Sequence, residues 1–211
     1  MANTQRLALL LSALGGAVGA LLLRSALRLA GILYSRSKAL AVYDCASSEP
    51  SKPAELRHTW GCQVPDVEST NGKAWEYKPI RIERPPGEQI TGEHVIYGPY
   101  VNNFGKPGFY RVRFRIRGID LPNTDERIMV LDVVQAGFGT ETALRLLGQK
   151  IITARELSRT YEYFDVKCFA SGTGVYEYRC TVFKDAAALK GARVLFDNIK
   201  VYSDPPIWEM L

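Results

Sequence analysis

The chain has 211 residues, of which 46% are hydrophobic and 23% are charged, and its formal net charge is +5. Setting aside about 45 N-terminal residues leaves enough chain for one well-buried domain. The basic charge does not indicate nucleic-acid binding, because the chain has no zinc-finger spacing, RNP-type motif or basic recognition helix. Much of the excess charge also lies beside a membrane-type segment, where anionic headgroups are the simpler partner.

Residues 7–23, LALLLSALGGAVGALLL, are apolar throughout apart from Ser12. At a rise of about 1.5 Å per residue they span roughly 25 Å, near the lower end of what a bilayer core requires. A cleaved signal peptide would have a shorter apolar core followed by a small-x-small site, and no such site follows directly. We therefore predict a single-pass transmembrane helix, within a region 1–43 that continues as an amphipathic helix.

One face of this predicted helix carries small residues that would let another helix approach closely. They are Ser12, Gly15, Gly16, Gly19 and Ala20. Positive residues follow the apolar run and would lie at the membrane surface. They are Arg24, Arg28, Arg36 and Lys38. We therefore expect the lipid bilayer and other membrane protein subunits to be partners.

Two features of the sequence give opposite predictions for the side of the membrane on which the folded domain lies. The positive-inside rule would put the folded domain in the cytoplasm. The even set of cysteines is compatible with two disulfides in an oxidising compartment, although buried free thiols are an alternative. The set is Cys45, Cys62, Cys168 and Cys180. We expect an extracytoplasmic, periplasmic domain.

Residues 44–79 are rich in Pro, Ser, Gly and charge and show no sustained periodicity, which is typical of a linker. Trp60 and Trp75 add large apolar surface, so we expect part of this linker to pack on a neighbouring domain or on a partner.

Residues 80–203 form a series of short strands separated by turn residues, which predicts a mainly β fold of the β-sandwich type. The expected strands cover 80–83, 93–101, 109–118, 128–134, 142–147, 162–169, 175–183 and 192–202. Residues 184–191, KDAAALKG, indicate one helical turn. We expect Tyr176, Tyr178 and Cys180 to share a core-facing side of their strand.

Strict alternation in residues 109–118, FYRVRFRIRG, predicts a half-buried strand. Tyr110, Val112, Phe114 and Ile116 would face the core, and four arginines would face outward. The four are Arg111, Arg113, Arg115 and Arg117. Such a row could bind phosphate or carboxylate groups. We expect instead a solvated face whose charge is compensated by acidic neighbours such as Asp165 or Glu177.

Several segments together resemble carbohydrate-binding modules of the galactose-binding-like jelly-roll type. These segments are IYGPYV, KPGFYRVRFRIRG, VLDVV, YEYFDVKCF and ARVLFDNIKVY. The resemblance implies a jelly-roll β-sandwich behind the transmembrane helix, and it implies sugar binding through exposed rings and planar polar groups. The loop residues that offer such groups are Tyr100, Asn102, Asn103 and Phe104. It also implies a possible structural calcium, for which Glu83 and Asp197 are the matching acidic positions.

No catalytic signature is present, since the chain lacks HExxH, GxSxG and CxxC motifs. We therefore expect a non-enzyme and no cofactor beyond the possible calcium. Two functions remain. In the first, the protein is an accessory or scaffold subunit of a membrane complex, docking through Trp60, Trp75 and the apolar tail 204–211, which contains Trp208. In the second, it is a membrane-tethered carbohydrate-binding module of the cell envelope that binds glycan.

Overall fold

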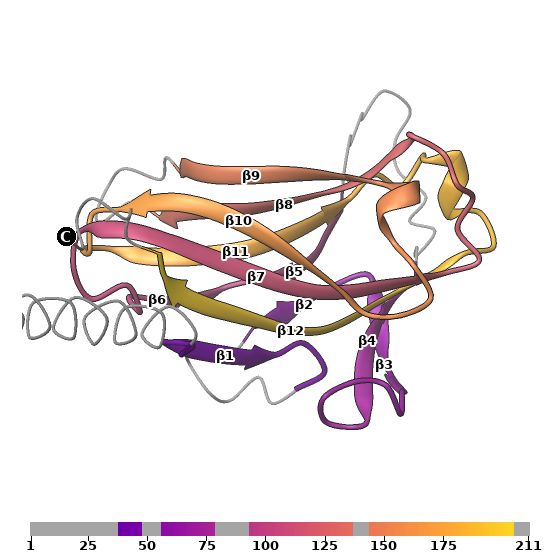
Figure 1. Ribbon diagram of the computed structural model, residues 1–211, viewed down its shortest axis with the longest axis horizontal. Coiled ribbons are helices and arrows are strands. Elements are labelled where there is room, and N and C mark those ends of the chain that lie inside the picture. Colours follow the sequence, from indigo (N-terminus) through magenta and orange to yellow (C-terminus); the bar gives the residue numbers. More distant parts are fainter. Residues whose placement is uncertain (1–37, 48–55, 79–92, 137–143, 205–211) are drawn as a thin grey trace, which may run out of the picture. The chain divides into compact units, whose positions relative to one another are not determined.

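The computed structural model describes residues 38–47, 56–78, 93–136 and 144–204, which form two antiparallel β-sheets (Figure 1). The predicted mainly β sandwich is confirmed. The predicted transmembrane helix over 7–23, with its small-residue face and Arg24, Arg28 and Arg36, lies outside the described residues. Within the described ranges no helix has the length and hydrophobicity needed to cross a bilayer.

Sheet A contains six strands in the order β10-β7-β12-β4-β3, with β1 paired to β12. Their bounds are β1 (Ala41–Asp44), β3 (Gly61–Pro65), β4 (Lys73–Tyr77), β7 (Gly108–Ile119), β10 (Glu162–Ala170) and β12 (Arg193–Ser203). Sheet B has the order β2-β5-β11-β8-β9, with β6 paired to β11. Its bounds are β2 (Arg57–His58), β5 (Glu93–Tyr97), β6 (Pro99–Val101), β8 (Arg127–Ala136), β9 (Arg145–Thr153) and β11 (Val175–Val182).

From β7 onward the chain passes repeatedly between the two sheets. β7 lies in sheet A, β8 and β9 in sheet B, β10 in sheet A, β11 in sheet B and β12 in sheet A. This exchange of consecutive strands between layers is typical of jelly-roll sandwiches. Two short 3₁₀ helices, Ala154–Glu156 and Ala187–Leu189, cover the connections after β9 and β11. The second is the helical turn predicted within 184–191.

The core lies between the sheets and is built by alternation. In β7 the inward side chains of Tyr110, Val112, Phe114 and Ile116 are buried, and the four arginines between them face outward, as predicted. From β11, Tyr176, Tyr178 and Cys180 also point into the core, as predicted. Burying one large apolar side chain contributes roughly 1.5–3 kcal/mol, so this shared interior holds the two sheets together.

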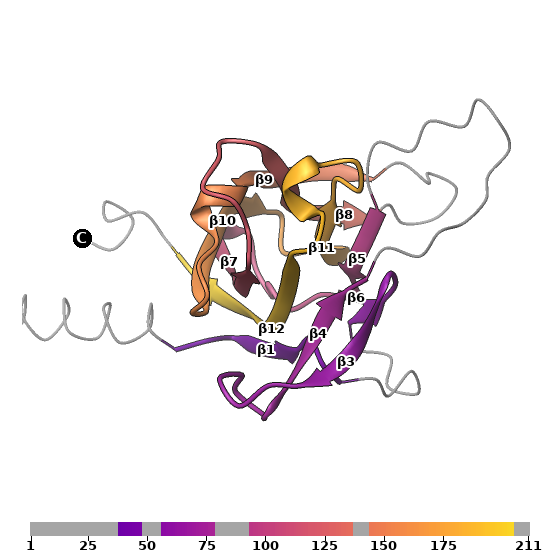
Figure 2. The same cartoon turned by 90° about the vertical axis from the view of Figure 1, so that its right-hand side faces the viewer.

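The prediction of a linker over 44–79 is wrong for the described residues of that segment. Residues 57–77 contain β2, β3 and β4, and β4 lies next to β12 in sheet A (Figure 2). These strands have two to five residues each, too few for a periodicity to show in the sequence. The sandwich therefore begins at β1, so the predicted helical extension to residue 43 is also wrong for Ala41–Asp44. The expected strand over 80–83 lies outside the described residues.

Packing of the two tryptophans explains why 56–78 belongs to the domain. Trp60 and Trp75 pack against the core, and the ring of His58 stacks on Trp75 with centroids 4.5 Å apart. A Cβ atom placed on Gly61 would lie 2.4 Å from the Glu76 carbonyl oxygen and 2.5 Å from Trp75 Nε1. Glycine at this position therefore lets β3 approach β4 closely.

All four cysteines are free thiols, so the predicted disulfides are not present. Cys168 and Cys180 do not lie on neighbouring strands, because β10 belongs to sheet A and β11 to sheet B. Both are buried, and burial raises the pKa of the Cys168 thiol to about 12. These residues act as small apolar core side chains.

Candidate functional site

The outer face of sheet A carries the four arginines of β7, and acidic side chains compensate them. Arg113 makes a two-point ion pair with Asp165 of β10, with nitrogen–oxygen distances of 2.7 and 2.9 Å. Arg117 pairs with Asp66 and Glu68 at 2.8 and 2.7 Å. The predicted compensation is thus confirmed for Asp165, whereas the other expected partner, Glu177, lies on the opposite sheet.

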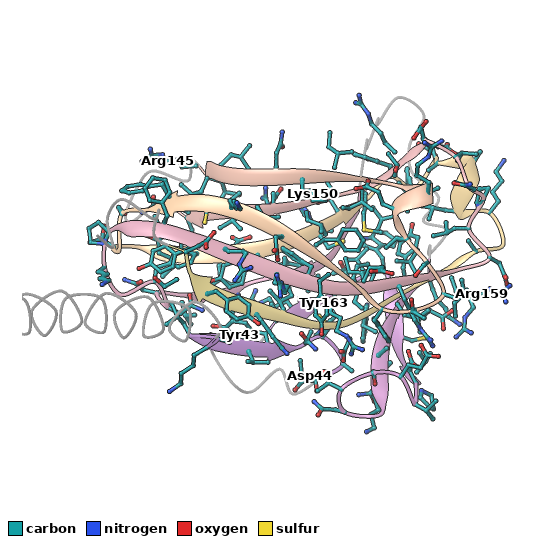
Figure 3. All side chains as sticks on the ribbon, viewed as in Figure 1. Tyr43, Asp44, Arg145, Lys150, Arg159 and Tyr163 are labelled. Atoms are coloured by element: carbon teal, nitrogen blue, oxygen red, sulfur yellow. The ribbon has the colours of Figure 1, made fainter. Side chains whose placement is uncertain are left out.

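Tyrosine rings separate these guanidinium groups. Arg115 lies 4.3 Å from the ring centroid of Tyr161, and Arg111 lies 4.8 Å from that of Tyr202. Arg113 lies 5.2 Å from the ring of Tyr163, which Figure 3 labels on this face. Ion pairs and tyrosine rings thus hold the guanidinium groups in place along this face, although Arg115 Nε and Arg117 Nε are buried without a hydrogen-bond partner.

The outer face of sheet B carries a different arrangement, which we call the sheet B cluster. Its members are Arg57, Tyr97, Tyr100, Asp132, Glu177 and Arg179. Arg179 of β11 and Asp132 of β8 are directly opposite each other and form a two-point ion pair at 2.7 and 2.9 Å. Only 9% of the Asp132 side chain and 16% of the Arg179 side chain are exposed. A fork-to-fork pair of this kind fixes both planar groups.

Glu177 lies two residues before Arg179 on the same face and is only 6% exposed. Burial raises its pKa above the ordinary value, while the charge of Arg179 and a hydrogen bond from Tyr100 lower it. Burial likewise raises the pKa of the Tyr100 hydroxyl. The Tyr100 hydroxyl therefore stays protonated and donates a hydrogen bond to the Glu177 carboxylate.

Two tyrosine rings border these charged groups. Tyr97 and Tyr100 meet edge to face with centroids 6.4 Å apart, and the Arg57 guanidinium lies 5.1 Å from the Tyr100 centroid. Both rings are half-buried. Tyr100 adopts a φ of 62°, unusual for a residue with a side chain, directly after Pro99. The backbone is thus held in a strained conformation that sets the position of this ring, as is frequent at functional sites.

His94 extends the cluster along β5. Its Nδ1 lies 2.7 Å from Thr181 Oγ1, and burial lowers the pKa of the imidazole, with the charge of Arg179 adding to the effect. The ring is therefore neutral at physiological pH and offers a hydrogen-bonding group without a charge.

Among the four residues of the predicted ligand loop, the prediction is wrong for Phe104. Phe104 is 3% exposed, with its ring against Tyr110 and Tyr176, so it cannot stack on a ligand. Asn103 accepts a hydrogen bond from Tyr178 and donates one to Tyr43, which ties it to the core.

Asn102 donates a hydrogen bond to the Gly172 carbonyl at 2.8 Å and thereby joins two loops. Tyr100 is the one predicted loop residue that belongs to the sheet B cluster.

Of the two predicted calcium positions, the structure describes Asp197. Asp197 is 1% exposed, and its oxygens accept hydrogen bonds from the Thr70 backbone and side chain, from Asn198 and from Arg115. Each Asp197 oxygen thus already accepts at least one hydrogen bond from the protein, whereas calcium takes about six to eight oxygens. Glu83 lies outside the described residues. Among the residues described, no group of three or more His, Cys, Asp or Glu side chains could hold a metal ion.

The predicted partner contacts are also revised. Trp60 and Trp75 are half-buried and pack against the domain's own core, which is the first of the two alternatives expected for segment 44–79. Trp208 and the tail from residue 205 lie outside the described residues. The sequence analysis did not find the sheet B cluster, and its one local signal was Asp132, the polar residue within the apolar run of β8.

Chemically, the sheet B cluster combines planar hydrogen-bonding groups with two half-buried tyrosine rings. Two guanidinium groups accompany two carboxylates, so its charges balance internally. A charged ligand would upset this balance, whereas an uncharged polyhydroxyl ligand can bond to the remaining donor and acceptor positions. Aromatic rings beside such groups suit the apolar faces of sugar rings.

No family model matches the chain, and no curated protein matches it. Solved structures do. A carbohydrate-binding module of Cellvibrio mixtus lichenase 5A in complex with cellotriose has 10% identity and a TM-score of 0.45, over 79% of this chain and 99% of that one. A native family 35 carbohydrate-binding module from Clostridium thermocellum has 14% identity and a TM-score of 0.45, over 78% of this chain and 98% of that one.

A third similar structure contains the CBM22-1 and GH10 modules of a Clostridium thermocellum endo-1,4-beta-D-xylanase complexed with xylohexaose. It has 11% identity and a TM-score of 0.48, over 80% of this chain and 29% of that one. Identities and TM-scores at this level assign the chain to no family and leave its ligand to be argued from its own residues.

Proposed function

We propose that this protein is a non-catalytic glycan-binding module, carried at a membrane by the helix expected over 7–23, and that it binds an uncharged glycan through the sheet B cluster. The observation that carries the proposal is the pairing of Asp132 and Arg179 beside the rings of Tyr97 and Tyr100. Removing two charged groups from water costs desolvation free energy, which their mutual attraction often only offsets. A largely buried pair at an outward-facing strand position therefore favours a role in binding over a role in stability.

Rigid placement supports binding more than catalysis. Both oxygens of Asp132 accept hydrogen bonds from Arg179, which fixes the orientation of that carboxylate. Glu177 is the remaining carboxylate of the cluster, and its raised pKa alone does not supply the acid and base pair that glycoside hydrolysis requires. The cluster therefore suits recognition, in which preformed groups bind without losing conformational entropy.

The scaffold function that the sequence also suggested loses part of its support. It depended on Trp60 and Trp75 as docking residues, and both pack within the domain. The small-residue face of the expected membrane helix still favours a helix partner. A partner in the membrane and a glycan on the sheet B cluster are compatible, because they use different parts of the chain.

The proposal is tested by affinity electrophoresis of the detergent-solubilised full chain in gels containing soluble β-glucan, xylan, mannan or galactan. We expect retardation by at least one of these neutral polysaccharides and no release of reducing sugar on prolonged incubation. Absence of retardation by all four would contradict glycan binding of this class. Release of reducing sugar would contradict the non-catalytic assignment.

A further inference from the structure

One end of the sandwich gathers exposed apolar side chains. Among the described residues nine large hydrophobic side chains are exposed, and six of them lie at the end where β1, β7 and β9 begin and β10 and β12 finish (Figure 1). The six are Leu40, Val42, Phe109, Leu144, Leu146 and Phe169, with exposed fractions of 40–59%. We call this region the apolar end.

Contacts between strands show that the six belong to one region. Phe109 and Phe169 are directly opposite on β7 and β10, with rings 5.1 Å apart. The Phe109 carbonyl accepts a hydrogen bond from Asp204, and Leu40 bonds to Val201 near the same end of β12.

On sheet B, Leu146 is opposite Val134, next to the pair of Arg145 and Gln135. The Gln135 side chain bonds to the loop at Ser171 and Thr173, which follows Phe169. The two sheets therefore contribute to the apolar end together.

The charged residues at this end are mainly cations. Exposed Lys106 and Lys167 lie near Phe109 and Phe169, and Lys200 is opposite Val42. Arg145, labelled in Figure 3, lies between Leu144 and Leu146. Apolar side chains interspersed with Lys and Arg are the composition that binds the interface of an anionic bilayer, with rings and aliphatic groups below the headgroups and cations beside the phosphates.

The course of the chain favours the same occupant. Leu40 is where the chain joins the sandwich, and residues 24–39 connect it to the transmembrane helix that the sequence predicts over 7–23. Such a helix would tether the joining point to the bilayer. If lipid covers this end of the sandwich, the rings of Phe109 and Phe169 are removed from water without being buried in the core.

We propose that the apolar end of the sandwich lies against the surface of a membrane containing anionic lipids, with Phe109, Phe169 and Leu146 inserted among the headgroups. This contact orients the domain on its anchor. It uses none of the sheet B cluster, so it does not depend on the glycan-binding function proposed above.

The test uses the full chain in vesicles of phosphatidylcholine with phosphatidylglycerol. A Cys62→Ser background removes the one half-exposed thiol, and single cysteines at positions 169 and 146 carry a nitroxide label. Matched controls are Tyr163→Cys, with 52% exposure against 52% for Phe169, and Ile151→Cys on β9. Each variant is first required to melt at the temperature of its parent.

We expect labels at 169 and 146 to collide more with membrane-dissolved oxygen than with an aqueous nickel chelate, and the control labels to show the reverse. The contrast should weaken in vesicles of phosphatidylcholine alone. Labels at 169 and 146 that are as accessible to nickel as the controls would overturn the proposal. Protection of these sites only after a second protein is added would also overturn it, by assigning the apolar end to a protein partner. Polysaccharide retardation of the same variants reports separately on glycan binding.

Discussion

At the scale of single residues, burial in the domain shifts the pKa values of titratable side chains away from their ordinary values. His58 stacks on Trp75, its Nε2 is buried without a hydrogen-bond partner, and burial lowers its pKa to about 4. Glu177 is the opposite case, an acid whose pKa burial raises. Both shifts make stability depend on pH, with different signs.

For His58 we predict a loss of stability on acidification. The folded pKa of about 4 lies below the ordinary 6.5, so as pH falls between these values the unfolded chain takes up a proton that the folded chain does not. The His58→Gln variant should lose less melting temperature than the parent across this window, as followed by circular dichroism. Equal losses in the two proteins would show that His58 is not the responsible group.

For Glu177 we predict that the Glu177→Gln variant is more stable than the parent near neutral pH. The raised pKa means that stability from this group is fully present in acid and is lost as pH rises through the folded pKa. The advantage of the variant should therefore shrink as the pH is lowered. A variant that is less stable at neutral pH, or whose advantage grows in acid, would contradict this assignment.

At the scale of elements, the sequence was informative where alternation is long. The run from Tyr110 to Arg117 predicted β7 and both of its faces correctly, because the period of a strand needs several residues to show. The hairpin of β3 and β4 was missed, since its pairing depends on Gly61 and on packing of Trp75 within its own domain. The expected strand 142–147 overlaps β9 over 145–147, and β9 runs from Arg145 to Thr153.

The candidate site was less predictable than the fold. The alternation within a strand shows which side chains share a face of that strand. Which side chains from different strands share a face of a sheet depends on the order of the strands, and no short stretch of sequence indicates that order. Glu177 was therefore expected beside the β7 arginines, although it lies on the other sheet. Tyr100 was predicted as a ligand residue for its exposed ring, and Phe104 was mistaken for one because an aromatic loop residue can equally fill the core.

Gly61 gives a direct test of the β3–β4 hairpin. Adding one methyl group in Gly61→Ala would place a carbon 2.4 Å from the Glu76 carbonyl oxygen, so we expect a loss of roughly 1–3 kcal/mol in the free energy of unfolding. The control is Gly108→Ala, where the nearest atom would be 3.7 Å away, and it should change stability by far less. Urea unfolding measures both, and similar values for the two variants would contradict the packing described.

The ion pair of Asp132 and Arg179 is the element-scale test of the cluster. Asp132→Ala leaves a largely buried guanidinium without its carboxylate, which should cost about 3 kcal/mol. The double variant Asp132→Leu with Arg179→Met should recover much of this loss, because no uncompensated charge remains. A double variant as unstable as the single one would show that the pair itself is essential to stability rather than kept for binding.

At the scale of the whole molecule, the described domain presents three different surfaces. The outer face of sheet A is closed by arginine and tyrosine pairs, the outer face of sheet B carries the charge-balanced cluster, and the apolar end combines exposed rings with cations. We propose that the last contacts lipid while the cluster remains open to glycan. Membrane attachment and ligand binding would then be served by separate regions of one sandwich.

The central claim is that the sheet B cluster binds glycan, and a titration of Tyr97→Ala tests it most directly. Calorimetry would use the full chain in detergent and whichever polysaccharide retards the parent, with Tyr163→Ala on the outer face of sheet A as control. The account predicts at least a tenfold loss of affinity for Tyr97→Ala, about 1.4 kcal/mol, and parental affinity for Tyr163→Ala. Unchanged affinity in Tyr97→Ala with a loss in Tyr163→Ala would contradict it and move the site to sheet A.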